Sequence, residues 1–281
     1  MTVFLNGRFL PKPEARISPD DRGFLFADGV YEVIRVYHGR LFETEAHLER
    51  LERSLRELRI HGAEEVDFLG IAETLIERNN LGASDAIVYL QVTRGVAPRK
   101  HAFPSADVPP TVYGYASAYD VPLQQLEQGV KAILAPDIRW ARCDIKTVSL
   151  LPNVLANQQA KEAGALEAVL VRDGAVTEGS HSNFAAVIED VFVTAPLSNY
   201  ILGGITRGVV LGLCRKLGIP VREFPILEHE LARADEMLLL GTTTEVLPVV
   251  QLGEVPVGEG QLGPVTRRLQ QAFRELASST P

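Results

Sequence analysis

The 281-residue chain has few cysteines and no excess of basic residues. Its two cysteines, Cys143 and Cys214, are too few for a disulfide framework in a chain of this length, which favours a reduced, cytoplasmic protein. The formal net charge is -8 at pH 7 and the pI is near 5.4. A nucleic-acid partner is therefore not expected, because a protein that neutralises phosphates needs a basic face.

Long apolar stretches are missing as well. No run approaches the roughly 18 apolar residues that a membrane-spanning helix requires. The N-terminus lacks the basic region and apolar segment of a signal peptide. We therefore expect a protein that neither spans a membrane nor is exported.

The motifs of several enzyme classes do not occur. The sequence has no Gly-x-Ser-x-Gly, no Walker loop, no His-Glu-x-x-His and no Cys-x-x-Cys. Its histidines show no metal-ligand spacing, so we predict no metal site. Lysine is scarce too, because 22 of the 28 basic residues are arginine, which leaves few candidates for lysine chemistry.

The composition is that of an ordinary globular protein, with 46% hydrophobic and 23% charged residues. In the first half, Asn6-Gly7 between two short apolar segments predicts a tight hairpin. Leucines at 48, 51, 55 and 58 predict an amphipathic helix. Further elements are expected as a helix over 66–79 and strands over 29–36, 86–94 and 111–118.

The second half shows the same mixture of patterns. We expect strands over 130–135, 167–171, 182–188 and 191–194, and helices over 153–163, 206–218 and 265–276. The sequence thus predicts a mixed α/β protein of two domains. We place a small N-terminal domain at 1–119, an interdomain linker at 120–128 around Pro122, and a larger C-terminal domain at 129–281.

Two side chains are candidates for chemistry. Lys146 has mostly apolar and hydroxyl neighbours, and desolvation makes a lysine amine available as a nucleophile. On spacing alone, an ordinary solvated lysine is the commoner case. Glu178 ends a short strand, and if it faces inward it needs a cationic partner because an unpaired buried carboxylate is costly.

Three other segments are candidate binding elements. The two glycines before Thr206 place this threonine at a predicted helix N-cap, where backbone N–H groups favour a phosphate, although most such caps hold no ligand. Hydroxyl residues cluster again at 242–244. Arg99 and His101 point the same way if their loop is extended, which suits a carboxylate, but an exposed basic loop is the alternative.

Together these segments resemble a known family, the fold type IV pyridoxal-phosphate (PLP) enzymes. Their order and spacing are most similar to those of the D-amino acid (D-alanine) aminotransferases, from about Asn6 to the final helix. The motifs that carry the resemblance are Asp21-Arg-Gly-Phe-Leu-Phe-Ala-Asp-Gly-Val-Tyr-Glu32, Arg99-x-His101, Cys143-Asp-Ile-Lys146, Thr177-Glu-Gly-Ser180 and Gly204-Ile-Thr-Arg207.

The resemblance implies a PLP cofactor, makes the larger C-terminal domain at 129–281 the expected PLP-binding domain, and assigns residues to the cofactor. Lys146 is expected to form the Schiff base with PLP and then to move a proton between Cα and C4′. Glu178 is expected to hydrogen-bond the pyridine nitrogen and keep it protonated. The residues implied for the phosphate are Arg50, Ile205, Thr206 and Thr242.

The resemblance also implies how substrate is bound. Tyr31, Arg99 and His101 look like the carboxylate-binding residues of the D-amino acid enzymes, in which the Arg-x-His loop comes from the neighbouring subunit. A homodimer that exchanges amino groups between D-alanine or D-glutamate and 2-oxo acids is therefore expected. The alternatives within this fold are an L-branched-chain aminotransferase, an (R)-amine transaminase and an aminodeoxychorismate lyase. A PLP-free dimeric scaffold is the alternative outside it.

Two positions depart from the family pattern. Gly241 and His181 stand where the D-amino acid enzymes often carry serine. Gly241 removes a hydroxyl near the expected phosphate, and His181 adds an imidazole beside Glu178. Both changes bear on the side-chain preference of the enzyme.

Overall fold

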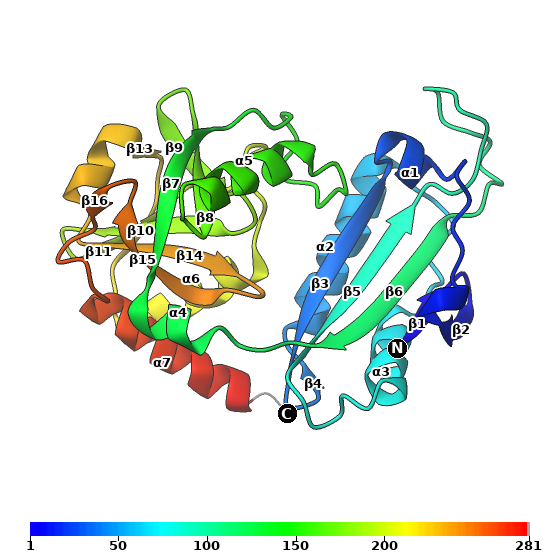
Figure 1. The fold of residues 1–281 in the computed structure, drawn as a ribbon, viewed down its shortest axis with the longest axis horizontal. Coiled ribbons are helices and arrows are strands. Elements are labelled where there is room, and N and C mark those ends of the chain that lie inside the picture. The colour runs from blue at the N-terminus through cyan, green and yellow to red at the C-terminus, as the bar shows by residue number, and fades with distance from the viewer. Residues whose placement is uncertain (280–281) are drawn as a thin grey trace. The chain divides into compact units, whose positions relative to one another are not determined.

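The computed structural model describes residues 1–279, and this part of the chain divides into two compact units (Figure 1). Unit 1 contains Met1–Asp120 and Ile145–Ser149, and unit 2 contains Val121–Asp144 and Leu150–Ser279. Strands and helices occur in both units, which confirms the predicted mixed α/β fold. The predicted linker includes helix α4 (Leu123–Gln128), and the assignment of independent folding domains stays a prediction.

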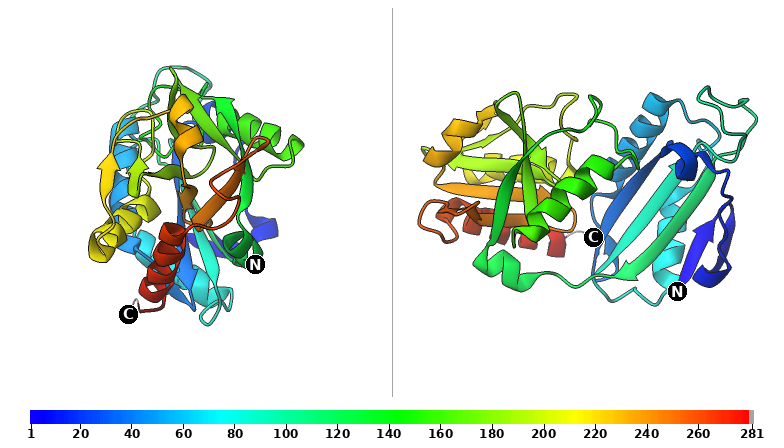
Figure 2. Two further views of the ribbon diagram at one scale, coloured as in Figure 1. Left: turned by 90° about the vertical axis from the view of Figure 1, so that its left-hand side faces the viewer. Right: turned by 45° about the horizontal axis from the view of Figure 1, so that its top comes forward.

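Unit 1 is built on a six-stranded antiparallel sheet with the order β2-β1-β6-β5-β3-β4. Its long central strands lie side by side (Figure 2, right). The first hairpin turns at Asn6 and Gly7 with φ values of 47° and 82°, as a tight two-residue turn requires, so the predicted hairpin is confirmed. The strands are β1 (Thr2–Leu5), β2 (Arg8–Pro11), β3 (Gly29–Tyr37), β4 (Arg40–Leu41), β5 (Ala86–Thr93) and β6 (Thr111–Ala118).

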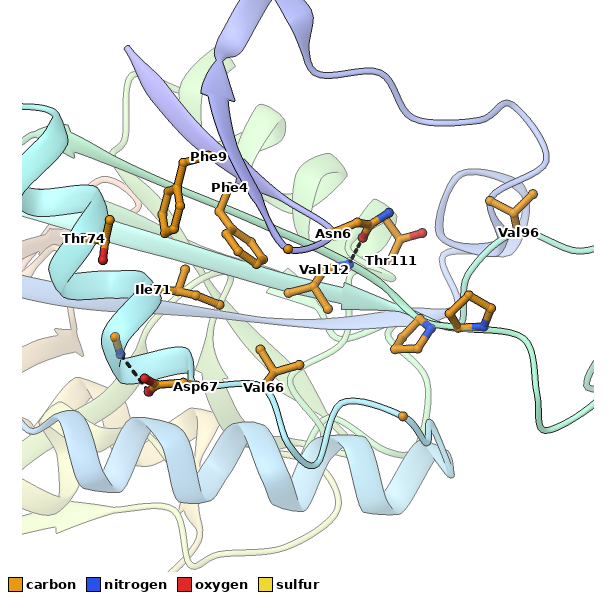
Figure 3. A pocket seen from close by; sticks show the side chains of 15 residues that line it. Phe4, Asn6, Phe9, Val66, Asp67, Ile71, Thr74, Val96, Thr111 and Val112 are labelled. Atoms are coloured by element: carbon orange, nitrogen blue, oxygen red, sulfur yellow. Dashed lines mark hydrogen bonds between the residues drawn. The ribbon is translucent and has the colours of Figure 1, made fainter.

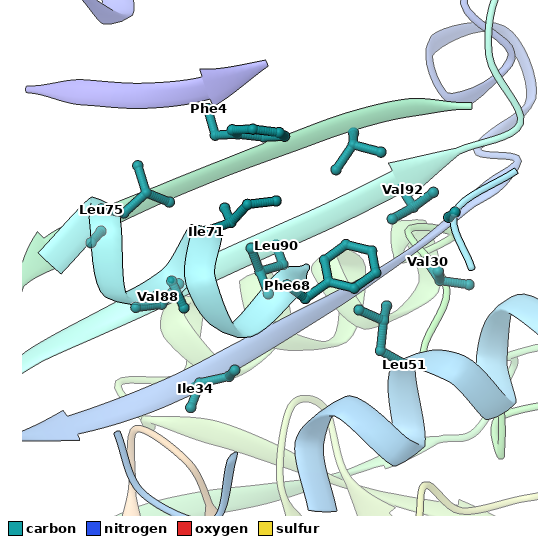
Figure 4. Close-up of a cluster of buried hydrophobic side chains, with 14 of the residues drawn as sticks. Phe4, Val30, Ile34, Leu51, Phe68, Ile71, Leu75, Val88, Leu90 and Val92 are labelled. Atoms are coloured by element: carbon teal, nitrogen blue, oxygen red, sulfur yellow. The ribbon is translucent and has the colours of Figure 1, made fainter. Parts of the chain in front are cut away.

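Helices α2 (Thr44–Leu58) and α3 (Phe68–Arg78) pack on this sheet and close its core (Figure 4). Leu51 of α2 and Leu75 of α3 are fully buried against Val30, Ile34 and Leu90, and each such burial stabilises the fold by about 1.5–3 kcal/mol. The predicted amphipathic helix is therefore confirmed as α2. The unit also contains α1 (Arg22–Phe26) and the 3-10 helix η1 (Lys12–Glu14).

Unit 2 is built on a ten-stranded mixed sheet with the order β12-β11-β10-β14-β15-β7-β8-β9-β13, and β16 pairs with β15. Strand β7 is parallel to both of its neighbours, and β11 is parallel to β12. The strands are β7 (Val130–Pro136), β8 (Glu167–Arg172), β9 (Ala175–Gly179), β10 (Asn183–Ile188), β11 (Val191–Thr194), β12 (Val221–Glu223), β13 (Ile226–Leu227), β14 (Glu236–Gly241), β15 (Glu245–Leu252) and β16 (Val255–Pro256).

The helices of unit 2 lie against this sheet. Helix α5 (Leu151–Glu162) packs on β7 and β8, and helices α6 (Ile205–Leu217) and α7 (Pro264–Ser279) pack on each other and on β14 and β15. The 3-10 helix η2 (Glu228–Arg233) follows β13. Within residues 1–279, no helix combines the length and the apolar character needed to cross a membrane.

The start of α6 corrects one prediction. The N-cap is Gly204 rather than Thr206, which is the second residue of the helix. A Cβ atom at Gly204 would lie only 1.9 Å from Oδ1 of Asn183, so the close approach of β10 requires glycine there. Helix α6 begins at Ile205, directly after this glycine.

Candidate active site

Lys146 lies in the short segment Ile145–Ser149, which belongs to unit 1. Its backbone carbonyl accepts a hydrogen bond from the N–H of Tyr31 at 3.0 Å, and its own N–H donates to Oγ of Ser54 at 3.3 Å. The ammonium nitrogen lies 4.3 Å from the centre of the Tyr31 ring. Lys146 is half-buried, so strand β3 and helix α2 fix its backbone while the amine stays accessible.

Tyr31 belongs to a row of tyrosines across the sheet of unit 1. Its ring stacks on Tyr89 at a centroid distance of 5.7 Å, and Tyr89 stacks on Tyr115 at 5.2 Å. Burial, together with the neighbouring phenols, raises the pKa of Tyr89. The row holds the Tyr31 ring beside Lys146, which brings two of the predicted site residues together.

Arg50, which the sequence predicts to hold phosphate, is bound to a buried carboxylate. Its Nε and Nη2 atoms donate to the two oxygens of Glu32 at 2.7 and 2.8 Å, and His47 Nδ1 lies 2.8 Å from Oε2. Burial alone raises the pKa of Glu32, but Arg50 and His47 bring it down to about 2. The sequence did not predict this pairing. Its only signal is the alternation along β3, by which Glu32 faces away from Tyr31.

Arg99 and His101 lie in an exposed loop of unit 1. The guanidinium carbon of Arg99 is 5.0 Å from the centre of the Phe26 ring, and the ring of His101 is 5.5 Å from it. Both predicted carboxylate ligands therefore lie against one aromatic side chain.

In unit 2, Glu178 is a buried carboxylate with donors on both oxygens. Asn183 Nδ2 and the backbone N–H of Leu202 donate to its Oε2 at 2.9 and 3.0 Å, and Arg139 donates to its Oε1. Burial raises the pKa of Glu178 to about 7, although the charge of Arg139 opposes this shift. A further cation beside Glu178 would favour its ionised form.

Sequence analysis did not find Arg139, which links Glu178 to a second carboxylate. Arg139 binds Asp137 through Nε and Nη2, both at 2.9 Å, and Arg172 lies 3.0 Å from Asp137. Burial raises the pKa of Asp137, but Arg139 lowers it to about 2. The spacing of Asp137 and Arg139, two apart in an extended segment, is the only signal that the sequence offers for this network.

The other three residues predicted for the phosphate lie in two segments of unit 2. Ile205 and Thr206 form the first turn of α6, whose N-cap makes no side-chain capping bond. Thr242 is half-buried in the turn between β14 and β15. In the same turn, the hydroxyl of Thr244 is buried without a hydrogen-bond partner among the described residues, and a Cβ atom at Gly241 would lie 2.7 Å from it.

His181, one of the two departures from the family pattern, is placed by a fully buried glutamate. The backbone N–H of His181 and the hydroxyl of Ser182 donate to Oε1 of Glu167 at 2.8 and 2.9 Å. The ring nitrogen Nε2 lies 3.3 Å from Oε2 of Glu167, and the imidazole stays half-exposed. Glu167 therefore shapes the loop that directly follows Glu178.

Unit 1 also contains an open, mostly apolar pocket of about 750 Å³ between the β1–β2 hairpin and α3 (Figure 3). The side chains of Phe4, Phe9 and Ile71 face this space. No predicted site residue is among the described residues that line it. An apolar lining does not suit a phosphate or a carboxylate, so this pocket is not the candidate site.

Comparison with known proteins assigns the family. Residues 29–252 match the family described as Amino-transferase class IV. The chain belongs to this family of aminotransferases. It is 42% identical over 280 residues to a D-alanine aminotransferase of Staphylococcus aureus (strain MSSA476), covering 99% of this chain and 98% of that protein. A D-alanine aminotransferase of Bacillus licheniformis is 42% identical over 275 residues, covering 98% and 96%.

Branched-chain amino acid aminotransferases are among the solved structures with a similar fold. The Escherichia coli enzyme superposes with a TM-score of 0.90 at 28% identity, covering 98% of this chain and 94% of that chain. The Thermobaculum terrenum enzyme in its PLP form superposes with a TM-score of 0.84 at 26% identity, covering 98% and 93%. These structures confirm the predicted fold type.

Class IV aminotransferases exchange amino groups between amino acids and 2-oxo acids with PLP as cofactor. The residues of unit 2 fit such a group. The N-terminus of α6 and the unpaired hydroxyl of Thr244 suit a phosphate, and the buried carboxylate of Glu178 suits a protonated ring nitrogen. In unit 1, the half-buried Lys146 supplies an amine.

Proposed function

We propose that this aminotransferase acts on D-amino acids of the D-alanine and D-glutamate type and uses Lys146 as its cofactor-bearing lysine. The observation that carries the proposal is the 42% identity to D-alanine aminotransferases over nearly the full length of both chains. The contact between Lys146 and Tyr31 in unit 1 supports it, because it joins the proposed amine to a proposed substrate ligand.

Lys146 is the residue that we assign to covalent attachment and proton transfer. Bound PLP supplies an electron sink for the pair of electrons that the Cα–H bond leaves behind. The amine of Lys146 would accept the proton from Cα and deliver it to C4′, and the contacts to Tyr31 and Ser54 hold the backbone from which this side chain projects. Covalent attachment and proton abstraction use the neutral amine, and delivery of the proton uses the protonated form.

Besides Lys146, several residues hold the cofactor in this proposal. Glu178 would accept a hydrogen bond from the ring nitrogen and keep that nitrogen protonated, while Arg139 balances the charge of the carboxylate. The backbone N–H groups at the start of α6 and nearby hydroxyls bind the phosphate. The residues assigned to the phosphate are Arg50, Ile205, Thr206 and Thr242.

The carboxylate of the substrate is bound by Tyr31, Arg99 and His101. Arg99 supplies a planar pair of N–H donors for bidentate binding, which fixes the orientation of Cα as well as adding affinity. We propose that Arg99 and His101 come from the neighbouring chain, so that a homodimer is the active unit. With the carboxylate fixed, only one hand of amino acid presents its Cα–H to Lys146.

We place the reaction in the cytoplasm. Cys143 and Cys214 are both buried and unpaired. Free thiols of this kind suit a reducing compartment.

An L-branched-chain activity is the second candidate. It is favoured by the TM-score of 0.90 with the Escherichia coli branched-chain enzyme, but the identity to that enzyme is 28%, against 42% to the D-alanine aminotransferases. The Arg99-x-His101 loop, which we assign to carboxylate binding, also makes an (R)-amine transaminase or an aminodeoxychorismate lyase less fitting, because neither needs this grip on an α-carboxylate.

Steady-state assays of the PLP-loaded protein distinguish these activities. With D-alanine and 2-oxoglutarate, we expect stoichiometric pyruvate and D-glutamate, the latter identified by chiral chromatography. L-Leucine with 2-oxoglutarate serves as the matched reaction. Turnover of L-leucine alone would reject the D-amino acid assignment in favour of the branched-chain one.

A further inference from the structure

We propose that Arg22, Phe26 and Asp28 form a clamp that positions the substrate-binding loop 94–110. This inference rests on the proposed function, in which the loop supplies Arg99 and His101. The three clamp residues belong to the segment 21–32, whose role beyond Tyr31 the sequence left unassigned. We assign them as positioning residues because they contact the residues of the loop.

Arg22 hydrogen-bonds the loop at a point between Arg99 and His101. The side chain is buried, and its Nη1 donates to the backbone carbonyl of Lys100, the residue between Arg99 and His101, at 2.6 Å. The backbone N–H of Arg22 also donates to the carbonyl of Gly95 at 2.9 Å. One residue thus holds the loop at its start and at its functional tip.

Asp28 holds Arg22 in place and ties it to the base of the loop. Its carboxylate accepts from Nε of Arg22 at 2.8 Å and from Nε and Nη2 of Arg94 at 2.8 and 2.9 Å. Burial raises the pKa of Asp28, but the two arginines lower it below its ordinary value. The carboxylate therefore stays ionised, and both guanidinium groups keep their orientation.

The ring of Phe26 contacts the side chains of Arg99 and His101, the two proposed substrate-binding residues of the loop. The guanidinium carbon of Arg22 lies 4.7 Å from the centre of its ring, and that of Arg99 lies 5.0 Å from it. The ring of His101 lies 5.5 Å from the same ring. The aromatic ring therefore carries the Arg22 anchor and both proposed carboxylate ligands.

The far side of the loop is anchored separately. Phe103 lies under the guanidinium group of Arg94, which is 3.7 Å from its ring centre, and Arg94 donates to the carbonyls of Leu58 and Arg59, both at 2.7 Å. Arg94 thus connects Asp28 to the end of α2. The loop lacks regular secondary structure over most of its length, so these contacts replace strand pairing in fixing its shape.

The experiment compares Asp28→Asn and Phe26→Leu with the wild-type holoenzyme. Asp20→Asn is the matched control, because this exposed carboxylate directly precedes the segment and the substitution leaves the backbone contact of Asp20 with Ala97 unchanged. For each protein, kcat and KM are measured with D-alanine. Amide hydrogen exchange is followed by mass spectrometry in peptides that cover 95–104, and thermal denaturation checks folding.

We expect both clamp variants to raise KM for D-alanine about 10- to 100-fold with little change in kcat, because a ligand displaced by about 1 Å can cost about a hundredfold. Exchange in 95–104 should accelerate in both variants and not in Asp20→Asn. If Asp28→Asn does not fold, Phe26→Leu alone decides. Unchanged KM and exchange in the folded variants would overturn the clamp.

The two proposals fail in different ways. If the wild-type protein does not convert D-alanine, the proposed function is wrong. The exchange data then decide the clamp alone: faster exchange in 95–104 of the variants supports it, and wild-type exchange rejects it.

Discussion

The ammonium nitrogen of Lys146 lies 4.3 Å from the centre of the Tyr31 ring, and the N–H of Tyr31 donates to the carbonyl of Lys146 at 3.0 Å. The two residues are 115 positions apart in the chain. Because both backbone and side chain are engaged, a change at Tyr31 acts on the lysine as well as on the substrate. The two effects are separable by choosing which part of Tyr31 is removed.

Replacing Tyr31 should therefore give two different phenotypes. Tyr31→Phe keeps the ring beside Lys146 and loses only the hydroxyl, so we expect KM for D-alanine to rise about tenfold at nearly constant kcat. Tyr31→Ala also frees the lysine side chain and should lower kcat. Steady-state kinetics check this, and an equal loss of kcat in both variants would contradict it.

Replacing Lys146 by alanine should abolish the covalent attachment of PLP. The side chain is half-buried, so we expect the variant to fold and to lose at least about a hundredfold in kcat, the lower range for loss of a general acid–base group. Lys161→Ala, on the exposed face of α5, is the control. Absorbance after dialysis measures the retained cofactor. Full activity of Lys146→Ala would contradict the proposal that Lys146 binds the cofactor and transfers the proton.

The raised pKa of Glu178 predicts how the stability of the cofactor-free protein depends on pH. Its folded pKa of about 7 exceeds the ordinary value of 4.5, so its contribution is favourable below pH 4.5 and is lost as the pH rises to 7. Relative to Glu178→Gln, the wild type should lose up to about 3 kcal/mol over this interval. Urea denaturation of both proteins at several pH values tests this. A pH-independent difference would show that folding does not raise the pKa of Glu178.

The lowered pKa of Glu32 predicts that its contribution to stability changes with pH in the opposite direction to that of Glu178. Its folded pKa of about 2 lies below the ordinary 4.5, so its stabilisation is present above pH 4.5 and is lost as the pH falls towards 2. Glu32→Gln leaves the charge of Arg50 without its carboxylate and should cost about 3–5 kcal/mol at pH 7. Glu45→Gln, exposed on α2, is the control. Urea denaturation measures the free energy of unfolding of each variant. If Glu32→Gln lowered it no more than Glu45→Gln does, the buried pair would not be important for stability.

Mixing two inactive variants tests the proposed homodimer. Lys146→Ala lacks the amine, and Arg99→Ala lacks the carboxylate ligand. If Arg99 acts in the neighbouring chain, each mixed dimer has one complete site, and random reassociation of equal amounts should restore about a quarter of wild-type activity. Activity no higher than that of the separate variants would place Arg99 in the same chain as its Lys146.

Local structure was predictable where the signal is local. The Asn6-Gly7 turn depends on the φ values that these two residues adopt, and the leucines of α2 follow the helical period. The family motifs also predicted roles for residues, such as Lys146, whose function local patterns do not indicate. On spacing alone, that lysine was indistinguishable from a solvated one.

What the sequence did not predict depends on contacts between distant segments. Arg139 reaches Glu178 across 39 positions, and Arg22 reaches Lys100 across 78. The N-cap of α6 is Gly204, where Asn183 of strand β10 leaves no room for a side chain, whereas Thr206 was expected there. Ion pairs and close approaches of this kind follow from tertiary packing and leave no periodic pattern.

The most direct test is the absorbance spectrum of the PLP-loaded protein before and after D-alanine, with L-leucine and an (R)-amine in parallel. The account predicts that D-alanine bleaches the band of the lysine-bound cofactor, that L-leucine and the (R)-amine leave it unchanged, and that Lys146→Ala never shows it. Bleaching by L-leucine and not by D-alanine would keep the fold and Lys146 but contradict the proposed carboxylate site and the D-amino acid activity.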